Sequence, residues 1–126
     1  MVRIFPSITV SVVRQVSNLR IDCKLAGTVT ERDCNNVAPM CQLLLAQNHG
    51  VDLLLDISQL QHCSLLLLCK KLLVAAKHQD AFHHIAIFGG DSWQPVIAKL
   101  SQRWMIADVR HFHYRAEAIS WLDSAS

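Results

Sequence analysis

The order of patterns in the last third of this chain constrains its fold more than any other feature. The apolar run of residues 85–88 ends at a pair of glycines, which predicts a short strand closed by a tight turn. A helix is expected next, over residues 93–103, because Asp91 or Ser92 can serve as its N-cap.

A second strand and a second helix complete this pattern. Residues 109–114 are expected to form a strand with two unlike faces. Val109, His111 and His113 would lie on one face, and Arg110, Phe112 and Tyr114 on the other. Residues 116–122 then predict a closing helix. Strand, turn, helix, strand and helix in succession form the repeating unit of an α/β sheet. The chain has no Gly-x-Ser-x-Gly, P-loop or Gly-x-Gly-x-x-Gly motif, so it offers no recognisable catalytic signature.

Three further strands are expected upstream. Residues 9–16 and 19–25 are rich in β-branched side chains and are separated by Ser17-Asn18, which predicts an antiparallel hairpin with a two-residue turn. Residues 51–57 form a continuous apolar run with an aspartate near each end, which suits a central strand buried on both faces. A helix is expected after a short connection, over residues 61–78.

Another helix is predicted between the hairpin and the central strand. Thr30 followed by Asp33 is a helix start signal, and His49-Gly50 is expected to end the segment. Pro39 inside the segment predicts a kink or a late start. The apolar positions that recur at helical spacing are Val37, Met40, Cys41, Leu44 and Leu45.

The predicted architecture is a single α/β domain spanning residues 1–126. Its expected order is β-β-α-β-α-β-α-β-α, a mixed five-stranded sheet with about four helices and right-handed crossovers between parallel strands. A chain of 126 residues suffices for one core, and no linker or repeat divides it. Because 52% of its residues are hydrophobic and only 17% are charged, some apolar surface is expected to remain for a partner.

Composition argues against several classes of protein. The net charge of +2 and the absence of a basic run with aromatics argue against nucleic-acid binding. The N-terminus lacks a continuous apolar region, and no stretch has eighteen uninterrupted apolar residues, so neither a secretory signal nor a membrane span is expected. Five cysteines without CxxC spacing fit neither a disulfide framework nor a zinc knuckle. A cytoplasmic location is the simplest expectation.

Short motifs spread over nearly the whole chain match the pattern of a known protein family. The matching residues are Gly27 before residues 28–33, Leu53 to Asp56, Asp80, Phe82, residues 85–89, Trp93, Lys99-Leu100, Ala107, Val109-Arg110, Phe112, Ala118 and Trp121-Leu122. With these motifs the chain resembles the SpoIIAA-like family of small bacterial proteins, which belongs with the STAS domains. The resemblance implies a STAS-like fold, which is topologically similar to the CRAL-TRIO lipid-carrier fold, in which mobile helices close over an apolar ligand.

The predicted helix over residues 61–78 carries more leucine than one buried face can hold. Four consecutive leucines, residues 65–68, cannot all face one sheet, because each step turns the helix by about 100°. A first hypothesis is therefore binding of an apolar small molecule, or peripheral contact with the inner membrane surface. The residues assigned to this role are Leu66, Leu67, Lys70, Lys71, Val74, Trp93 and Ile97. A wide core stripe or a homodimer contact explains the same leucines.

A second hypothesis is a regulator that binds another protein, as anti-sigma-factor antagonists do. Those STAS domains are switched by phosphorylation of a serine in an Asp-Ser-Ser-Gly type motif, at the start of the helix after the third strand. That motif is not intact here. Ser64 is the candidate acceptor when one residue of gap is allowed, and Ser58 is a less favoured one.

Histidines raise the question of metal or acid–base chemistry. His111 and His113 share a strand face and can reach one ion, but no third ligand is evident, and the pair His83-His84 has none either. Neither a metal site nor a cofactor is expected, and the protein is expected to have no catalytic residues. The glycine pair before residue 91 is expected to serve turn geometry.

Overall fold

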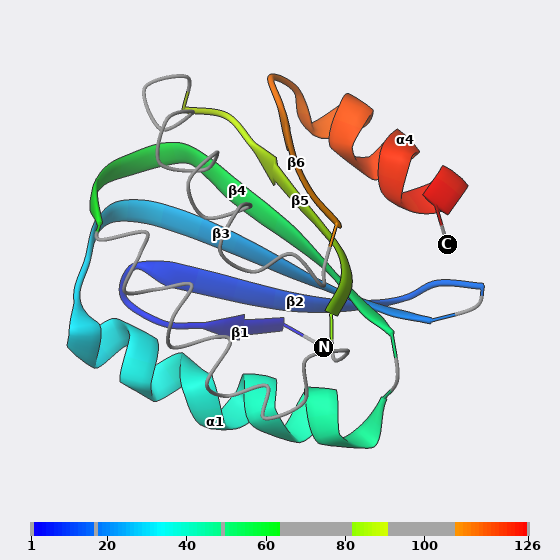
Figure 1. The fold of residues 1–126 in the computed structure, drawn as a ribbon. Helices are drawn as coiled ribbons and strands as arrows, with labels where there is room; N and C mark the ends of the chain where they lie inside the picture. Colours follow the sequence, from blue (N-terminus) through cyan, green and yellow to red (C-terminus); the bar gives the residue numbers. More distant parts are fainter. Residues whose placement is uncertain (1, 17, 49, 64–81, 91–107, 126) are drawn as a thin grey trace.

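A computed structural model describes residues 2–16, 18–48, 50–63, 82–90 and 108–125, and these form a six-stranded sheet with helices on its two faces (Figure 1). The strands follow each other across the sheet in sequence order. The elements are β1 (Val2–Ile4), β2 (Ile8–Arg14), β3 (Leu19–Val29), α1 (Glu31–Gln47), β4 (Val51–Cys63), β5 (Phe82–Phe88), β6 (Asp108–Phe112) and α4 (Arg115–Ala125).

The sheet is mixed, as predicted, but it has six strands and not five. β1, β2 and β3 are antiparallel, whereas β3, β4, β5 and β6 are parallel. The strand that the sequence did not predict is β1, which folds back onto β2 through Pro6-Ser7. The Phe5 N–H donates to the Ile8 carbonyl at 2.7 Å, closing this turn. Pro6 presets the backbone for a tight turn, and this turn lets residues 2–4 pair with β2 as an extra edge strand.

The predicted hairpin is confirmed with its turn one residue earlier. β2 and β3 pair from Ile8↔Leu25 to Arg14↔Leu19, and the Gln15 N–H donates to the Asn18 carbonyl at 2.8 Å. The turn therefore lies between Gln15 and Asn18, and not at residues 17 and 18.

The start of α1 is as predicted, but Pro39 does not delay it. The Asp33 N–H donates to the Thr30 hydroxyl at 3.3 Å, and the Thr30 N–H donates to the Asp33 carboxylate at 3.0 Å, which completes a capping box. The helix continues through Pro39 because its apolar face packs against the sheet. The buried residues of that face are Cys34, Val37, Cys41 and Leu45.

β4 is almost twice as long as predicted, and this changes the position of the expected second helix. Residues 61–63 belong to the strand, so the predicted helix start at residue 61 is wrong. The reason is that β3 also extends, to Val29, and its Thr28 and Val29 pair with His62 and Cys63. Residues 64–78 of the predicted helix lie outside the described residues, as does the predicted helix over residues 93–103. The described residues thus contain two of the four expected helices.

The core has two parts, one on each face of the sheet. The larger lies between α1 and strands β2 to β5, and includes the fully buried Val10, Ile21 and Ile57. The smaller lies under α4, where Ala118 and Leu122 meet Leu54, Ala86 and Phe88. α4 and β6 confirm the predicted closing helix and strand. Neither described helix is long and apolar enough to cross a membrane.

Candidate functional site

The parallel strands bring the C-terminal parts of β5 and β6 beside the middle of β4. Asp56 of β4 pairs with Phe88, the last residue of β5, and Phe88 pairs with Phe112, the last residue of β6. In parallel α/β sheets, binding sites form at the carboxyl ends of the strands, where the connecting loops begin. β5 ends at Phe88 and β6 at Phe112, whereas β4 continues to Cys63, beside the last residues of β3.

Asp56 and Ser58 form a local hydrogen-bonded pair at this position. The Ser58 hydroxyl donates to Asp56 Oδ1 at 2.6 Å, and the Ser58 backbone N–H donates to the same oxygen at 2.9 Å. Asp56 is half-buried, whereas Ser58 is exposed. The carboxylate therefore fixes an exposed hydroxyl on the surface of the sheet.

Two bulges in β4 explain why Ser58 stands out from the strand. From the pair Lys24↔Asp56 to the pair Ala26↔Gln59, β3 advances by two residues and β4 by three. A second extra residue enters β4 between Gly27↔Leu60 and Thr28↔His62. An extra residue bends a strand and redirects its side chains, and bulges occur often beside functional sites.

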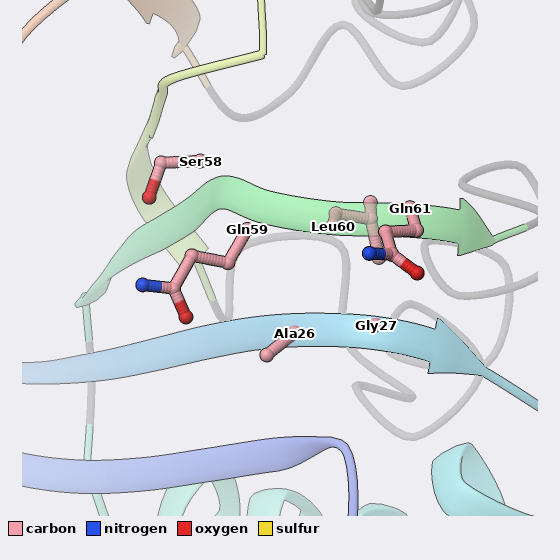
Figure 2. Close-up of a pocket in the computed structure, with 6 residues that line it drawn as sticks. All are labelled: Ala26, Gly27, Ser58, Gln59, Leu60 and Gln61. Atoms are coloured by element: carbon pink, nitrogen blue, oxygen red, sulfur yellow. The ribbon is translucent and has the colours of Figure 1, made fainter.

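The bulged region borders a shallow hollow of about 490 Å³ between β3 and β4 (Figure 2). Gln59 extends over the space between the two strands, and Ser58, Gln59 and Gln61 are exposed. Gly27 contributes no side chain, and a β-carbon there would meet nothing within 4 Å. The hollow is lined by Ala26, Gly27, Ser58, Gln59, Leu60 and Gln61. Its side chains are mostly uncharged donors and acceptors.

Gly89 closes the site from the side of β5. Its φ of +84° and its position against Ser58 both require glycine, because a β-carbon would lie 2.7 Å from the Ser58 Cα. The Gly89 N–H donates to the Phe112 carbonyl at 3.2 Å, and its own carbonyl lies 3.0 Å from His111 Nε2. Since a carbonyl only accepts, His111 donates this hydrogen bond. Gly89 is thus fixed between β4 and β6.

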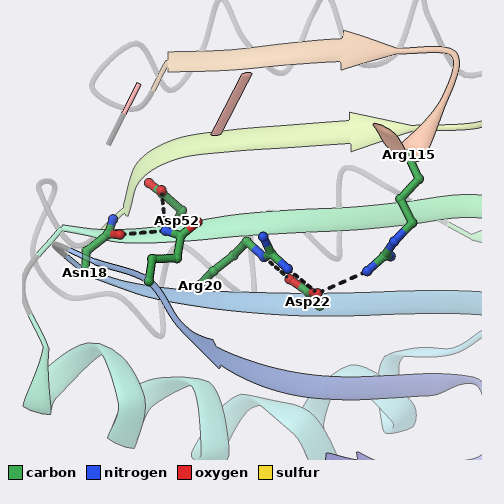
Figure 3. A network of polar contacts seen from close by, with 6 residues as sticks. Asn18, Arg20, Asp22, Asp52 and Arg115 are labelled. Atoms are coloured by element: carbon green, nitrogen blue, oxygen red, sulfur yellow. Dashed lines mark hydrogen bonds and ion pairs between the residues drawn. The ribbon is translucent and has the colours of Figure 1, made fainter. Parts of the chain in front are cut away.

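A second polar cluster lies at the amino ends of the parallel strands (Figure 3). The fully buried carboxylate of Asp52 accepts a hydrogen bond from Gln15 Nε2 at 3.0 Å and lies 3.2 Å from His84 Nδ1. Asn18 donates to the Gly50 carbonyl at 2.7 Å. These contacts connect the β2–β3 turn to the starts of β4 and β5, which is a structural role.

An ion-pair group joins α4 to β3 on the same face of the sheet. The Asp22 carboxylate lies 2.6 Å from Arg20 Nε and 3.4 Å from an Arg115 nitrogen (Figure 3). Arg20 is buried, whereas Arg115 is half-exposed. Because two guanidinium groups share one carboxylate, the group fixes the start of α4 against the sheet.

His111 and His113 lie near each other at the end of β6, and Cys23 and Cys41 are buried in the core. The rings of His111 and His113 are 5.8 Å apart, but no third His, Cys, Asp or Glu among the described residues completes a metal site with them. Burial raises the pKa of the Cys41 thiol to about 11. Burial also raises the pKa of Cys23 well above its usual value, with smaller contributions from Cys41 and Asp22. A raised pKa favours the protonated thiol, which is a weaker nucleophile than the thiolate.

The residues that the sequence assigned to ligand or membrane binding lie outside the described residues. They are Leu66, Leu67, Lys70, Lys71, Val74, Trp93 and Ile97, and the candidate acceptor Ser64 lies there too. Ser58 is described, and it lies inside β4 instead of beside a helix start. Sequence reasoning missed the convergence of Asp56, Ser58 and Gly89. Two features of the sequence could have indicated this site: the Asp-x-Ser spacing of residues 56–58 and the glycine pair of residues 89–90.

Comparison with known proteins identifies relatives of this fold. The sequence profile of the SpoIIAA-like family matches residues 20–123. The crystal structure of an uncharacterized protein with a SpoIIAA-like fold from Shewanella loihica PV-4 superimposes with a TM-score of 0.72. It is 23% identical in sequence, and the alignment covers 97% of this chain and 98% of that one. No curated protein matches the chain.

Proposed function

This chain belongs to the SpoIIAA-like family, and we propose on that premise that it is a non-enzymatic regulator that binds another protein. Its fold is consistent with a regulator similar to anti-sigma-factor antagonists. The observation that carries the proposal is the exposed Ser58 hydroxyl, which Asp56 holds at the bulge of β4. A fixed, exposed hydroxyl beside a hollow can contact a partner protein, and modification of that hydroxyl can control the contact.

The contact surface is the hollow between β3 and β4. Its exposed hydroxyl and side-chain amides, from Ser58, Gln59 and Gln61, can both donate and accept hydrogen bonds with a partner's backbone. Gly27 lets a partner approach the backbone of β3 closely. The lining contains no charged side chain, so it favours a protein surface over a charged small molecule.

Phosphorylation of Ser58 would change this surface electrostatically. A phosphoserine carries a charge of about −1.5 to −2 near neutral pH, and the hydroxyl now lies 2.6 Å from an oxygen of Asp56. The two negative groups repel each other, while the close approach of Gly89 blocks movement toward β5. The phosphate would turn outward, over the hollow, and displace a partner. Ser64 remains a second proposed acceptor.

Affinity capture from cells that produce the protein tests the contact surface. We expect a defined protein to be captured by the wild type and by Thr28→Ser, a small change at an exposed position of β3. The same protein should be lost with Gln59→Arg, whose longer charged side chain fills the hollow. If Gln59→Arg captures the same proteins in the same amounts, the hollow is not the contact surface.

A second candidate function is binding of an apolar small molecule or of a membrane surface. It is supported by the apolar run of residues 65–76, which only Lys70 and Lys71 interrupt. Leucines withdrawn from water contribute about 1.5 to 3 kcal/mol each, and lysines about 1 kcal/mol each near anionic lipid. The proposed contact residues are Leu66, Leu67, Lys70, Lys71 and Val74, with Trp93 and Ile97.

Native mass spectrometry and vesicle sedimentation test this second candidate. A co-purifying apolar molecule that is released on denaturation would support a ligand cavity. Sedimentation with anionic vesicles that is lost in the variant K70E/K71E would support membrane contact. A protein that carries no such molecule and stays in the supernatant with vesicles rejects both forms of the idea.

A further inference from the structure

The first strand of the sheet has an exposed outer edge. β1 is the terminal strand in the sheet order and pairs only with β2 among the described strands (Figure 1). Its two apolar side chains are among the most exposed of the described large hydrophobic residues, with Val2 62% exposed and Ile4 80% exposed. Edge strands of this kind can pair with another strand.

The hydrogen-bonding pattern shows which backbone groups face outward. The Phe5 N–H donates to the Ile8 carbonyl, so this pair is a hydrogen-bonded one. Hydrogen-bonded and non-hydrogen-bonded pairs alternate along an antiparallel ladder. Arg3 therefore directs its N–H and carbonyl toward Val10 of β2. Val2 and Ile4 direct theirs away from the sheet, where an incoming strand can pair with them.

The side chains define the chemistry of the incoming strand. Val2 and Ile4 lie on one face of β1, and the exposed Arg3 lies between them on the other face. Cross-strand pairs are stabilised by apolar side chains opposite apolar ones and by opposite charges. We propose that β1 binds an extended segment of a partner protein in which an acidic residue lies between two β-branched apolar residues.

A second copy of this chain fits the same edge less well. If two β1 strands paired antiparallel over all three of their residues, Val2 would lie opposite Ile4 of the second copy, and Arg3 opposite Arg3. Like charges directly opposite each other are destabilising. The arginine therefore favours a different, acidic partner. This surface is separate from the hollow between β3 and β4, and its test does not depend on the proposed function.

A peptide titration followed by amide NMR tests the proposal. The probes are two synthetic pentapeptides, Thr-Val-Glu-Val-Thr and Thr-Val-Lys-Val-Thr, added to the full chain. The wild type should bind the glutamate peptide about fivefold more tightly than the lysine peptide, with shifts at the Val2 and Ile4 amides. Arg3→Glu should reverse this preference.

A proline variant separates edge pairing from other contacts. Ile4→Pro removes an outward N–H and leaves the β1–β2 ladder intact, so it should abolish binding of both peptides while the amide shifts of α1 stay unchanged. Equal affinity for both peptides would overturn the proposal, and so would millimolar peptide without shifts at Val2 and Ile4. A concentration-dependent dimer that Ile4→Pro dissociates would assign the edge to a second copy instead, and would also overturn it.

Discussion

Gly89 lies so close to Ser58 that a β-carbon on Gly89 would be 2.7 Å from both the Cα and the Cβ of Ser58. These residues are 31 positions apart in the chain: Ser58 lies in β4, and Gly89 directly follows β5, the parallel neighbour of β4. The contact places the end of β5 against the bulge of β4 and limits the directions that the Ser58 side chain can take. It therefore connects the stability of the sheet to the geometry of the proposed regulatory site.

Replacement of Gly89 should destabilise the protein more than replacement of Gly27. Gly89→Ala introduces a backbone clash at a φ of +84°, and we expect a loss of about 3 kcal/mol. Gly27→Ala has a φ of +69° but open space, so only the strained backbone remains, at about 1 kcal/mol. Urea denaturation measures both. Equal losses would show that the contact with Ser58 is not tight.

The capping box of α1 should make stability depend on pH. Hydrogen bonds from the Thr30 N–H and the Ser7 hydroxyl lower the pKa of Asp33. A lowered pKa in the folded state gives stability that is present above about pH 4, the ordinary value, and is lost as pH falls through the folded pKa. Asp33→Ala should therefore cost about 1 kcal/mol at pH 7 and much less near pH 2. An equal loss at both pH values would contradict this.

Removal of the buried carboxylate should weaken the amino end of the sheet. Asp52→Ala removes the acceptor of His84 and one of the two acceptors of Gln15 Nε2, and we expect a loss of about 3 kcal/mol. Asp108→Ala is the control, because its pair with Arg110 is exposed and 3.5 Å long, and it should change stability by less than about 0.5 kcal/mol. Thermal denaturation compares the two variants. A loss for Asp52→Ala no larger than that of the control would reject the structural role.

The buried thiols should resist alkylation in the native protein. Because burial raises the pKa values of Cys23 and Cys41, little thiolate is present at pH 8. Iodoacetamide should modify them on the order of a hundredfold more slowly than in urea, as followed by peptide mass spectrometry. Rapid modification without urea would contradict this prediction, because it would mean that α1 often separates from the sheet and exposes the thiols.

Local sequence signals predicted the parts of the fold that depend on local structure. The hairpin, the start of α1, and the succession of β5, β6 and α4 all have turn, cap or alternation signals close to them in sequence. β1 was missed because three residues give almost no periodic pattern. Residues 58–63 were missed because their pairing depends on how far β3 extends, which is a tertiary property.

The candidate site was less predictable than the fold. Asp56, Ser58 and the glycine pair were visible in the sequence, but their convergence depends on the pairing of β4 with β5 and on the bulges of β4. A bulge leaves little trace in a single sequence, because the extra residue can be of almost any type. The ligand- or membrane-binding role of the leucine-rich segment remains a prediction from the sequence, since residues 64–81 lie outside the described residues.

The most direct test of the central proposal is the affinity of the captured partner for Ser58→Glu and Ser58→Ala, measured by isothermal titration calorimetry. Ser58→Glu adds a negative charge beside Asp56, and Ser58→Ala removes the hydroxyl without adding charge. We predict that Ser58→Glu weakens binding at least about tenfold, by about 1.4 kcal/mol, while Ser58→Ala stays within about threefold of the wild type. If both variants bind as the wild type does, Ser58 does not control the contact, and the proposed regulatory site is wrong.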